Sequence, residues 1–190
     1  MNQKLLALYG LKWNPFTPGV PVQALHVTAR LHSFCWRVAQ LAGEGGFALV
    51  TGAPGSGKSV ALRILAEHLA AVVLAGDGRL AERLRTDEFL PLASRMRVRL
   101  AIERAPPQDL QDCLRHALHQ AGAPTLMTPE LIATLCDHAQ GNLRALMNIA
   151  GELLAAAAEG DARQIDEKLF FQTCAVSPAA ETRAAAGRRR

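Results

Sequence analysis

Eight consecutive residues, from Gly52 to Ser59, constrain this chain more than any other stretch. They read Gly-Ala-Pro-Gly-Ser-Gly-Lys-Ser and match G-x-x-x-x-G-K-[ST], the pattern of a phosphate-binding loop, at every fixed position. An apolar run, residues 47–50, leads into them. Apolar side chains at helical spacing follow: Val60, Leu62, Ile64, Leu65 and Leu69. Strand, glycine loop and helix start are the context that such a loop requires, so the sequence predicts a nucleotide-binding site here.

The residue types in this loop suit phosphate chemistry. Glycines let backbone N–H groups turn inward around phosphate oxygens without a side-chain collision, and the start of the following helix adds partial positive charge. We expect Lys58 to reach the β- and γ-phosphates of ATP and the Ser59 hydroxyl to bind Mg²⁺. The predicted binding residues are Gly52, Ala53, Pro54, Gly55, Ser56, Gly57, Lys58, Ser59 and Val60.

Length and composition favour one ordinary domain, or one domain with a small satellite, because the chain has 190 residues, of which 49% are hydrophobic. It contains no run of 18 apolar residues, so we expect no membrane span. The N-terminus lacks the apolar region and cleavage site of a signal peptide. The four cysteines, Cys35, Cys113, Cys136 and Cys174, form no C-x-x-C pair. Free thiols in a cytoplasmic protein are the expected state.

The net charge of +4 is unevenly distributed along the chain. Residues 1–78 carry a net charge of +3, residues 79–104 another +3, residues 105–176 a charge of −5, and residues 177–190 again +3. A basic front and tail beside an acidic block indicate either nucleic-acid binding or complementary contact between subunits.

Sequence pattern divides the chain into four parts. Residues 1–28 are predicted to form an N-terminal arm or linker, and residues 29–104 a shortened nucleotide-binding core. Residues 105–176 are predicted to form a helical lid domain, because their apolar spacing is helical throughout. Residues 177–190 lack apolar content and are predicted to be a disordered basic tail.

Two segments precede the predicted loop strand. The arm is broken by Pro15, Pro18 and Pro21, and we expect Trp13 and Phe16 to anchor it on the main domain. The next segment, residues 28–42, is predicted to be a helix that ends at the glycines 43, 45 and 46. Its buried face would consist of Leu31, Phe34, Cys35, Val38 and Leu41.

Two further strands are predicted after the loop helix. Residues 71–75 are short and apolar, and Gly76-Asp77-Gly78 follows them. A helix containing Leu80 and Leu84 comes next, interrupted by Pro91. Residues 96–102 then alternate as a strand does, with Arg95, Arg97 and Arg99 on one face, which is typical of an edge strand.

The remaining chain predicts four helices. The first, residues 107–121, buries a stripe from Leu110 to Ala121 and ends at Gly122. Thr128 is expected to cap the second, which ends at Gly141, and Asn142 to cap the third. Asp166 is expected to cap a short fourth helix.

Three of these features together resemble a known family. They are the glycine loop, residues 9–16 (Tyr-Gly-Leu-Lys-Trp-Asn-Pro-Phe) ahead of it, and residues 141–144 (Gly-Asn-Leu-Arg) at a helix start. With residues 73–76 followed by Leu80, they resemble the AAA+ ATPases of the general secretion pathway protein A type. The resemblance covers nearly the whole chain except the tail. It is strongest to the ATP-binding helper proteins encoded beside transposases in bacterial insertion elements.

The resemblance implies a fold and a set of partners. The fold is α/β, a P-loop NTPase of the AAA+ type with a reduced parallel sheet, flanking helices and a C-terminal helical lid. The implied function is that of an ATP-binding helper in DNA transposition, with Mg²⁺ as cofactor. The implied partners are a transposase, DNA bound without sequence preference, and further copies of the chain.

The resemblance also implies roles for residues outside the loop. Arg144 matches the sensor arginine of the lid, with a surface arginine as the alternative. Arg95 matches an arginine finger given to a neighbouring subunit's nucleotide, a role it shares with Arg97, with a charged sheet edge as the alternative. Asp77 lies where the family has its first sensor residue, and a helix N-cap explains it equally well.

One departure from the family is large. No apolar strand ends in Asp-Glu, the pair that holds Mg²⁺ and polarises the attacking water. Only 15 residues separate Ser59 from Ala75, so the block that carries this pair is missing near residues 70–72. Removing it from the family's strand order, 5-1-4-3-2, leaves the P-loop strand between two parallel neighbours and exposes an apolar edge. We therefore expect binding of ATP with impaired hydrolysis.

The sequence leaves two alternative functions open and offers two weak candidates for a metal site. A non-hydrolysing remnant used for nucleotide binding or interaction is the first alternative, and a small P-loop phosphotransferase with Arg79, Arg83 and Arg85 as a lid is the second. Metal binding by His116 with His119, or by Cys136 with His138, is disfavoured because neither pair has convincing further ligands.

Overall fold

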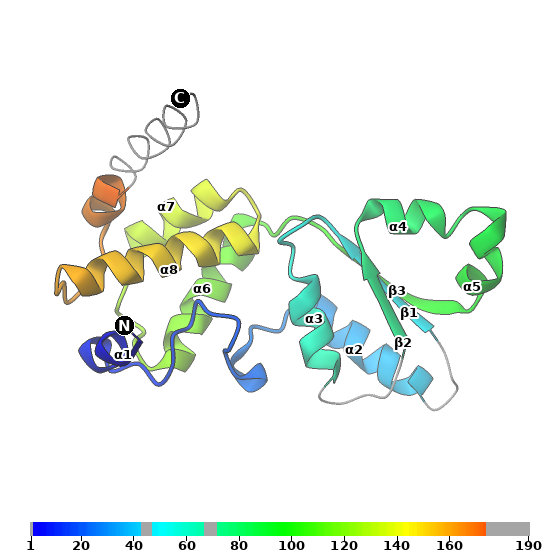
Figure 1. The fold of residues 1–190 in the computed structure, drawn as a ribbon, viewed down its shortest axis with the longest axis horizontal. Helices are drawn as coiled ribbons and strands as arrows, with labels where there is room; N and C mark the ends of the chain where they lie inside the picture. Colours follow the sequence, from blue (N-terminus) through cyan, green and yellow to red (C-terminus); the bar gives the residue numbers. More distant parts are fainter. Residues whose placement is uncertain (1, 43–46, 67–71, 174–190) are drawn as a thin grey trace, which may run out of the picture. The chain divides into compact units, whose positions relative to one another are not determined.

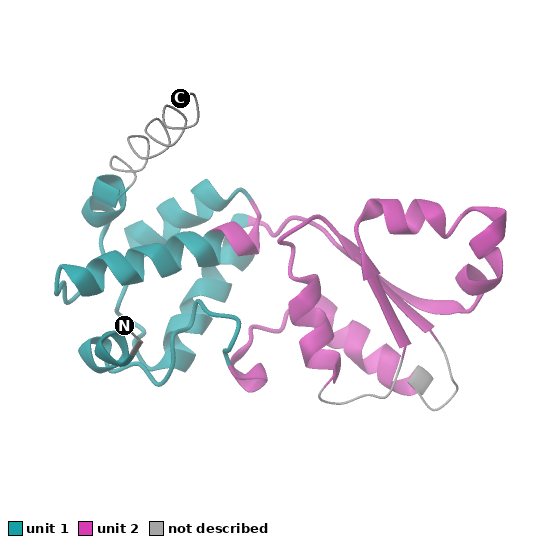
Figure 2. Ribbon diagram, viewed as in Figure 1, with its two compact units in different colours: residues 1–20, 107–140, 146–190 teal, residues 21–106, 141–145 magenta. Residues whose placement is uncertain are grey.

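The computed structural model describes residues 2–42, 47–66 and 72–173 (Figure 1). Several predictions fall outside these residues: the glycine stop at 43–46, the contribution of Leu69, the basic tail and Cys174. The described chain forms two compact units (Figure 2). Unit 1 comprises residues 1–20, 107–140 and 146–190, and unit 2 comprises residues 21–106 and 141–145.

Unit 2 is built on a three-stranded parallel sheet in the order β2-β1-β3. The strands are β1 (Phe47–Gly52), β2 (Val72–Gly76) and β3 (Met96–Ile102). The P-loop strand β1 is central, as predicted. Because both of its neighbours are in place, every residue from Ala48 to Val50 is buried. A parallel strand with both neighbours in place is hydrophobic throughout rather than alternating.

Helices cover both faces of this sheet (Figure 1). On one face, α2 (Ala29–Ala42) and α3 (Lys58–Ala66) bury Phe34, Val38 and Leu65 against β1 and β3. On the other face, Leu84 packs with Leu49 and Met96. The helix α2 begins as predicted, because the Thr28 hydroxyl accepts a hydrogen bond from the Leu31 N–H at 3.3 Å. A short 3-10 helix, η1 (Val22–Ala24), precedes it.

The segment between β2 and β3 corrects one prediction. Its first helix, α4 (Gly78–Arg83), contains Leu80 but ends before Leu84, and a 3-10 helix, η2 (Asp87–Phe89), follows. Pro91 does not interrupt a helix; it lies in the first turn of another, α5 (Leu90–Ser94). The first turn tolerates proline because its missing N–H would have no intrahelical partner there.

Unit 1 is helical, and its helix starts agree with the sequence. It contains α6 (Pro107–Ala121), α7 (Pro129–Ala139) and most of α8 (Leu143–Glu159), followed by helical residues 167–173. The Thr128 hydroxyl accepts from the Leu131 N–H at 3.3 Å, and the Asp166 carboxylate accepts from the Leu169 N–H at 3.0 Å. Each bond satisfies a helix-start amide that has no partner within the helix.

The N-terminal arm departs from its prediction in two ways. Residues 2–9 form a helix, α1 (Asn2–Tyr9), in which Leu5 is buried. An eight-residue helix is marginal alone, and this one is held chiefly by its packing, since the ion pair of 3.2 Å between Lys4 and Asp161 is exposed and adds little. The first 20 residues join the helical unit instead of the predicted main domain, and the Lys12 N–H donates to the Ala121 carbonyl at 2.9 Å.

Within residues 2–42, 47–66 and 72–173, no helix combines the length and the apolar character that crossing a bilayer needs.

Candidate functional site

The glycine loop lies at the carboxyl end of the central strand. Gly52 ends β1, and Lys58 begins α3. Gly52 pairs in register with Ile102 of β3, and a Cβ at Gly52 would lie 2.5 Å from the Ile102 carbonyl oxygen and 2.6 Å from Ser56 Oγ. No side chain fits there, so the pattern's first glycine is required by the close approach of two strands.

The other two glycines of the loop are required by its backbone. Gly55 has φ +80° and Gly57 has φ +100°, values that side-chain-bearing residues rarely adopt. The loop contains a turn in which the Ser56 N–H donates to the Ala53 carbonyl at 3.2 Å, and the Ala61 N–H donates to the Gly57 carbonyl at 3.0 Å. Neither bond uses the amides of Lys58 or Ser59, which begin the helix and are suited to an anion.

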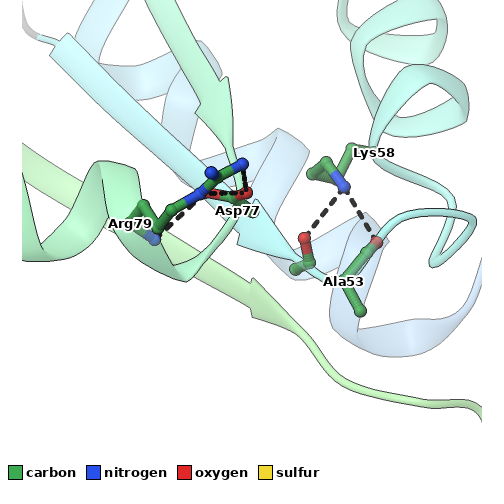
Figure 3. Close-up of polar contacts among 5 residues, drawn as sticks. Ala53, Lys58, Asp77 and Arg79 are labelled. Carbon is green, nitrogen blue, oxygen red and sulfur yellow. Dashed lines mark hydrogen bonds and ion pairs between the residues drawn. The ribbon is translucent and has the colours of Figure 1, made fainter.

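The Lys58 ammonium folds over the loop. Its Nζ donates to the carbonyl oxygens of Gly52 and Ala53, both at 2.9 Å (Figure 3). These two carbonyls hold the charge at the mouth of the loop, where phosphate oxygens would compete for it. A charge-assisted bond to a phosphate is stronger than one to a neutral carbonyl, so the lysine is placed to exchange partners.

Polar groups of the loop that lack hydrogen-bond partners in the described part of the chain suit a nucleotide phosphate and its Mg²⁺. Ser56 is buried, and its hydroxyl oxygen has no hydrogen-bond partner among the described residues. Ser59, in the first turn of α3, is an exposed residue. These residues would hold a β- or γ-phosphate through backbone amides and Lys58, and Mg²⁺ through Ser59.

Asp77 is engaged by local partners. It follows β2, whose Gly76 pairs with Thr51. Asp77 therefore lies at the carboxyl end of the sheet, as the glycine loop does (Figure 3). Its Oδ1 accepts from the Arg79 N–H at 3.0 Å, which caps α4, and its Oδ2 accepts from the Arg79 guanidinium at 2.8 and 3.0 Å. The Arg79 guanidinium lowers the pKa of this carboxyl, chiefly through the side-chain hydrogen bond.

A second carboxylate, which the sequence analysis did not identify, lies at the carboxyl end of the sheet. Glu103 directly follows Ile102, the residue of β3 that pairs with Gly52, and it is exposed. A signal was present in the sequence, since the residue that follows a strand beside the P-loop strand lies at the ligand edge of a parallel sheet.

The two predicted arginines differ in their relation to the loop. The backbone N–H of Arg144 donates to the Gly55 carbonyl at 3.2 Å, while the Arg144 side chain is exposed. Arg95 precedes Met96, which pairs with Phe47 at the amino end of the sheet. The strand separates Arg95 from its own chain's loop by roughly 20 Å, and Arg97, one residue into β3, is also exposed on that strand.

Among the described residues, no group of three or more His, Cys, Asp or Glu side chains is arranged to hold a metal ion. Burial raises the pKa of both Cys113 and Cys136 to about 11. Thiols of such high pKa are poor nucleophiles and poor metal ligands at neutral pH, and Cys35, Cys113 and Cys136 are free.

Comparison by sequence finds no relatives. No family model matches the chain, and no curated protein matches it.

Comparison by structure does find similar proteins. Cdc6p from Pyrobaculum aerophilum is 11% identical, with a TM-score of 0.63 over 80% of this chain and 67% of that one. The Orc1 protein of Aeropyrum pernix, solved in complex with DNA, is 11% identical, with a TM-score of 0.65 over 85% of this chain and 68% of that one. Drosophila ORC bound to DNA is 14% identical, with a TM-score of 0.59 over 89% and 64% of the two chains.

At these identities the likeness shows the fold. It confirms the predicted fold class, an α/β fold of the P-loop NTPase kind with a three-stranded parallel sheet and flanking helices.

Proposed function

We propose that this chain binds ATP with Mg²⁺ through the loop from Gly52 to Ser59. The observation that carries the proposal is the geometry of that loop at the carboxyl end of a central parallel strand. Its glycines have positive φ, its lysine is held at the mouth by two carbonyls at 2.9 Å, and a buried serine hydroxyl has no partner among the described residues. Residues 52–60, including Val60 in the first turn of α3, form the proposed contact surface.

The variant Lys58→Ala tests this proposal. Removing a charged hydrogen-bond donor to phosphate is expected to weaken ATP binding about 10- to 100-fold, while the circular dichroism spectrum stays unchanged. The measurement is equilibrium titration with a fluorescent ATP analogue. Lys168→Ala, which removes an exposed lysine of unit 1, is the matched control. Equal titration curves for Lys58→Ala and the wild type would contradict the assignment.

Hydrolysis is proposed to be impaired. A carboxylate that orients the attacking water is needed for in-line phosphoryl transfer. Asp77 is held by Arg79 and caps α4, and one aspartate cannot easily bind the metal and orient water at once. The first alternative, a nucleotide-binding remnant that does not hydrolyse ATP, differs from this proposal only in how far hydrolysis is reduced. The contacts of Asp77 with Arg79 favour that alternative over a phosphotransferase, because they occupy the Asp77 carboxylate.

The cellular role is proposed to be that of a helper in DNA transposition by an insertion element. Two features support it: the family resemblance of residues 9–16 and 141–144, and the fold shared with Orc1 and ORC, which were solved with DNA. The proposed partners are DNA, a transposase and further copies of the chain. In such an oligomer the exposed Arg95 or Arg97 would face the nucleotide of a neighbouring copy, and the Arg144 guanidinium would sense the γ-phosphate.

A further inference from the structure

The carbonyl oxygens of the glycine loop have to point away from a bound phosphate. A carbonyl oxygen that faced a phosphate oxygen would repel it, whereas an N–H group attracts it. The carbonyls of Gly52 and Ala53 accept from Lys58 Nζ. The carbonyl of Gly55 accepts a hydrogen bond from a distant part of the chain, the backbone N–H of Arg144, at 3.2 Å. The start of α8 at Leu143, 88 positions after Gly55, therefore determines where one loop peptide points.

Asn142 is the residue that holds this arrangement. Its Oδ1 accepts from the N–H groups of Arg144 at 3.0 Å and Ala145 at 3.2 Å. The same side chain occupies the place that a Cβ on Gly55 would need. The Arg144 amide is thus shared between Asn142 and the Gly55 carbonyl, a three-centre arrangement common at helix termini.

Residues that follow β3 also hold the segment around Asn142, within unit 2. The Ala105 N–H donates to the Gly141 carbonyl at 3.0 Å. Gly141 has φ +81°, and a Cβ there would lie 2.8 Å from Arg104 Cβ. Leu143 Cδ1 would lie 3.3 Å from a Cβ on Gly57. Residues 141–145 are therefore held between the chain that leaves β3 and the glycine loop.

We propose that Asn142 is a positioning residue for the phosphate-binding loop. It fixes the start of α8 against Gly55, so that the Gly55 carbonyl is turned toward α8 and the loop keeps its shape before a phosphate arrives. A preformed loop loses less conformational freedom on binding than a mobile one. This inference rests on the proposed nucleotide binding at the same loop.

The test compares two helix caps. Asn142→Ala removes a cap that touches the loop, and Thr128→Ala removes the cap of α7 in unit 1. Both variants should lose helix stability and show similar decreases in melting temperature. Only Asn142→Ala should weaken binding of a fluorescent ATP analogue, by about fivefold or more, as expected for the loss of one such contact. Thr128→Ala should bind within about twofold of the wild type.

A third variant separates the cap from the loop contact. Asn142→Ser keeps a capping hydroxyl but shortens the reach toward Gly55, so it should melt like the wild type and still bind ATP more weakly. It also carries the test if Asn142→Ala fails to fold. Wild-type affinity in either Asn142 variant, with ATP binding weakened in Lys58→Ala, would overturn this inference and leave the proposed function standing. Unchanged affinity in Lys58→Ala would overturn the proposed function instead.

Discussion

At the scale of a single residue, Asp77 has the arrangement of a helix cap. Its carboxylate accepts from the backbone and the guanidinium of Arg79. Both contacts stabilise the ionised form, and the hydrogen bond from the Arg79 side chain is the main reason that the Asp77 pKa is lowered. A metal-binding or water-orienting role would require Asp77 to leave these partners.

This account predicts the behaviour of Arg79→Gln. Removing the guanidinium should raise the Asp77 pKa toward the ordinary aspartate value of about 3.9, as measured by ¹³C NMR titration of the carboxyl carbon. Because the wild-type pKa is lowered, the pair stabilises the fold above the unfolded-state pKa, and this contribution is lost as pH falls through the folded-state pKa. Arg83→Gln, in the same helix, is the control, since Arg83 contacts the Phe89 ring instead. An unchanged Asp77 pKa in Arg79→Gln would show that the pair does not form in solution.

At the scale of elements, the two edges of the described sheet differ. The β3 edge carries Arg97 and Arg99 at exposed positions, a common protection against edge pairing. The β2 edge carries only Val72-Val73-Leu74-Ala75-Gly76, and Val72 is 53% exposed. The predicted apolar edge is therefore present, and it has no charge on the strand itself.

The variant Val72→Lys is expected to reduce self-association through this edge. A charged side chain on an edge strand opposes pairing with a second strand, and Val72 is exposed enough to accept one without a large loss of stability. Light scattering during a heating ramp should show a higher aggregation temperature. Val73→Lys is the contrasting variant, because Val73 packs against the buried cluster that contains Val50 and Leu65 and its replacement should destabilise the fold. Equal aggregation of Val72→Lys and the wild type would contradict this account of the edge.

The elements also show which features the sequence could predict. Local signals were sufficient for the glycine loop, for the caps at Thr128, Asn142 and Asp166, and for the alternation of β3, because each depends on neighbours within a few residues. The central place of β1 followed from the family's strand order and is confirmed.

Features that depend on distant parts of the chain were not predicted. The contact of Asn142 with Gly55 joins residues 87 positions apart, and no local pattern marks it. The helix α1 depends on packing within the helical unit rather than on its own propensity. Pro91 was misjudged because proline is a helix breaker in the interior but acceptable in the first turn.

At the scale of the whole molecule, the basic and acidic stretches of the chain fall mostly into different units. The basic stretch 79–104 belongs to unit 2, and the acidic stretch 105–176 lies mostly in unit 1. Any contact with DNA phosphates is therefore expected from unit 2 or from the basic residues 177–190, and it should be salt-sensitive and indifferent to base sequence.

The same view of the molecule predicts slow ATP turnover even when ATP is bound. The loop supplies positioning and positive charge, but the described carboxylates at its edge are Asp77, held by Arg79, and Glu103, which follows β3 on the far side of β1. Loss of a water-orienting group costs about 10²–10⁴-fold in rate. Arg95 from a neighbouring copy would stabilise charge without orienting water.

Steady-state phosphate release, measured with and without DNA, checks this prediction. Turnover should stay well below the roughly 1 per second of ordinary enzymes, and Lys58→Ala gives the background. Faster turnover that disappears in Lys58→Ala would mean that a carboxylate of this chain orients water after all. Asp77→Asn and Glu103→Gln would then identify it, because the responsible variant alone would lose the rate while keeping ATP affinity. Glu103 is the stronger candidate in that event, since the Asp77 carboxylate must first break two bonds to the Arg79 guanidinium.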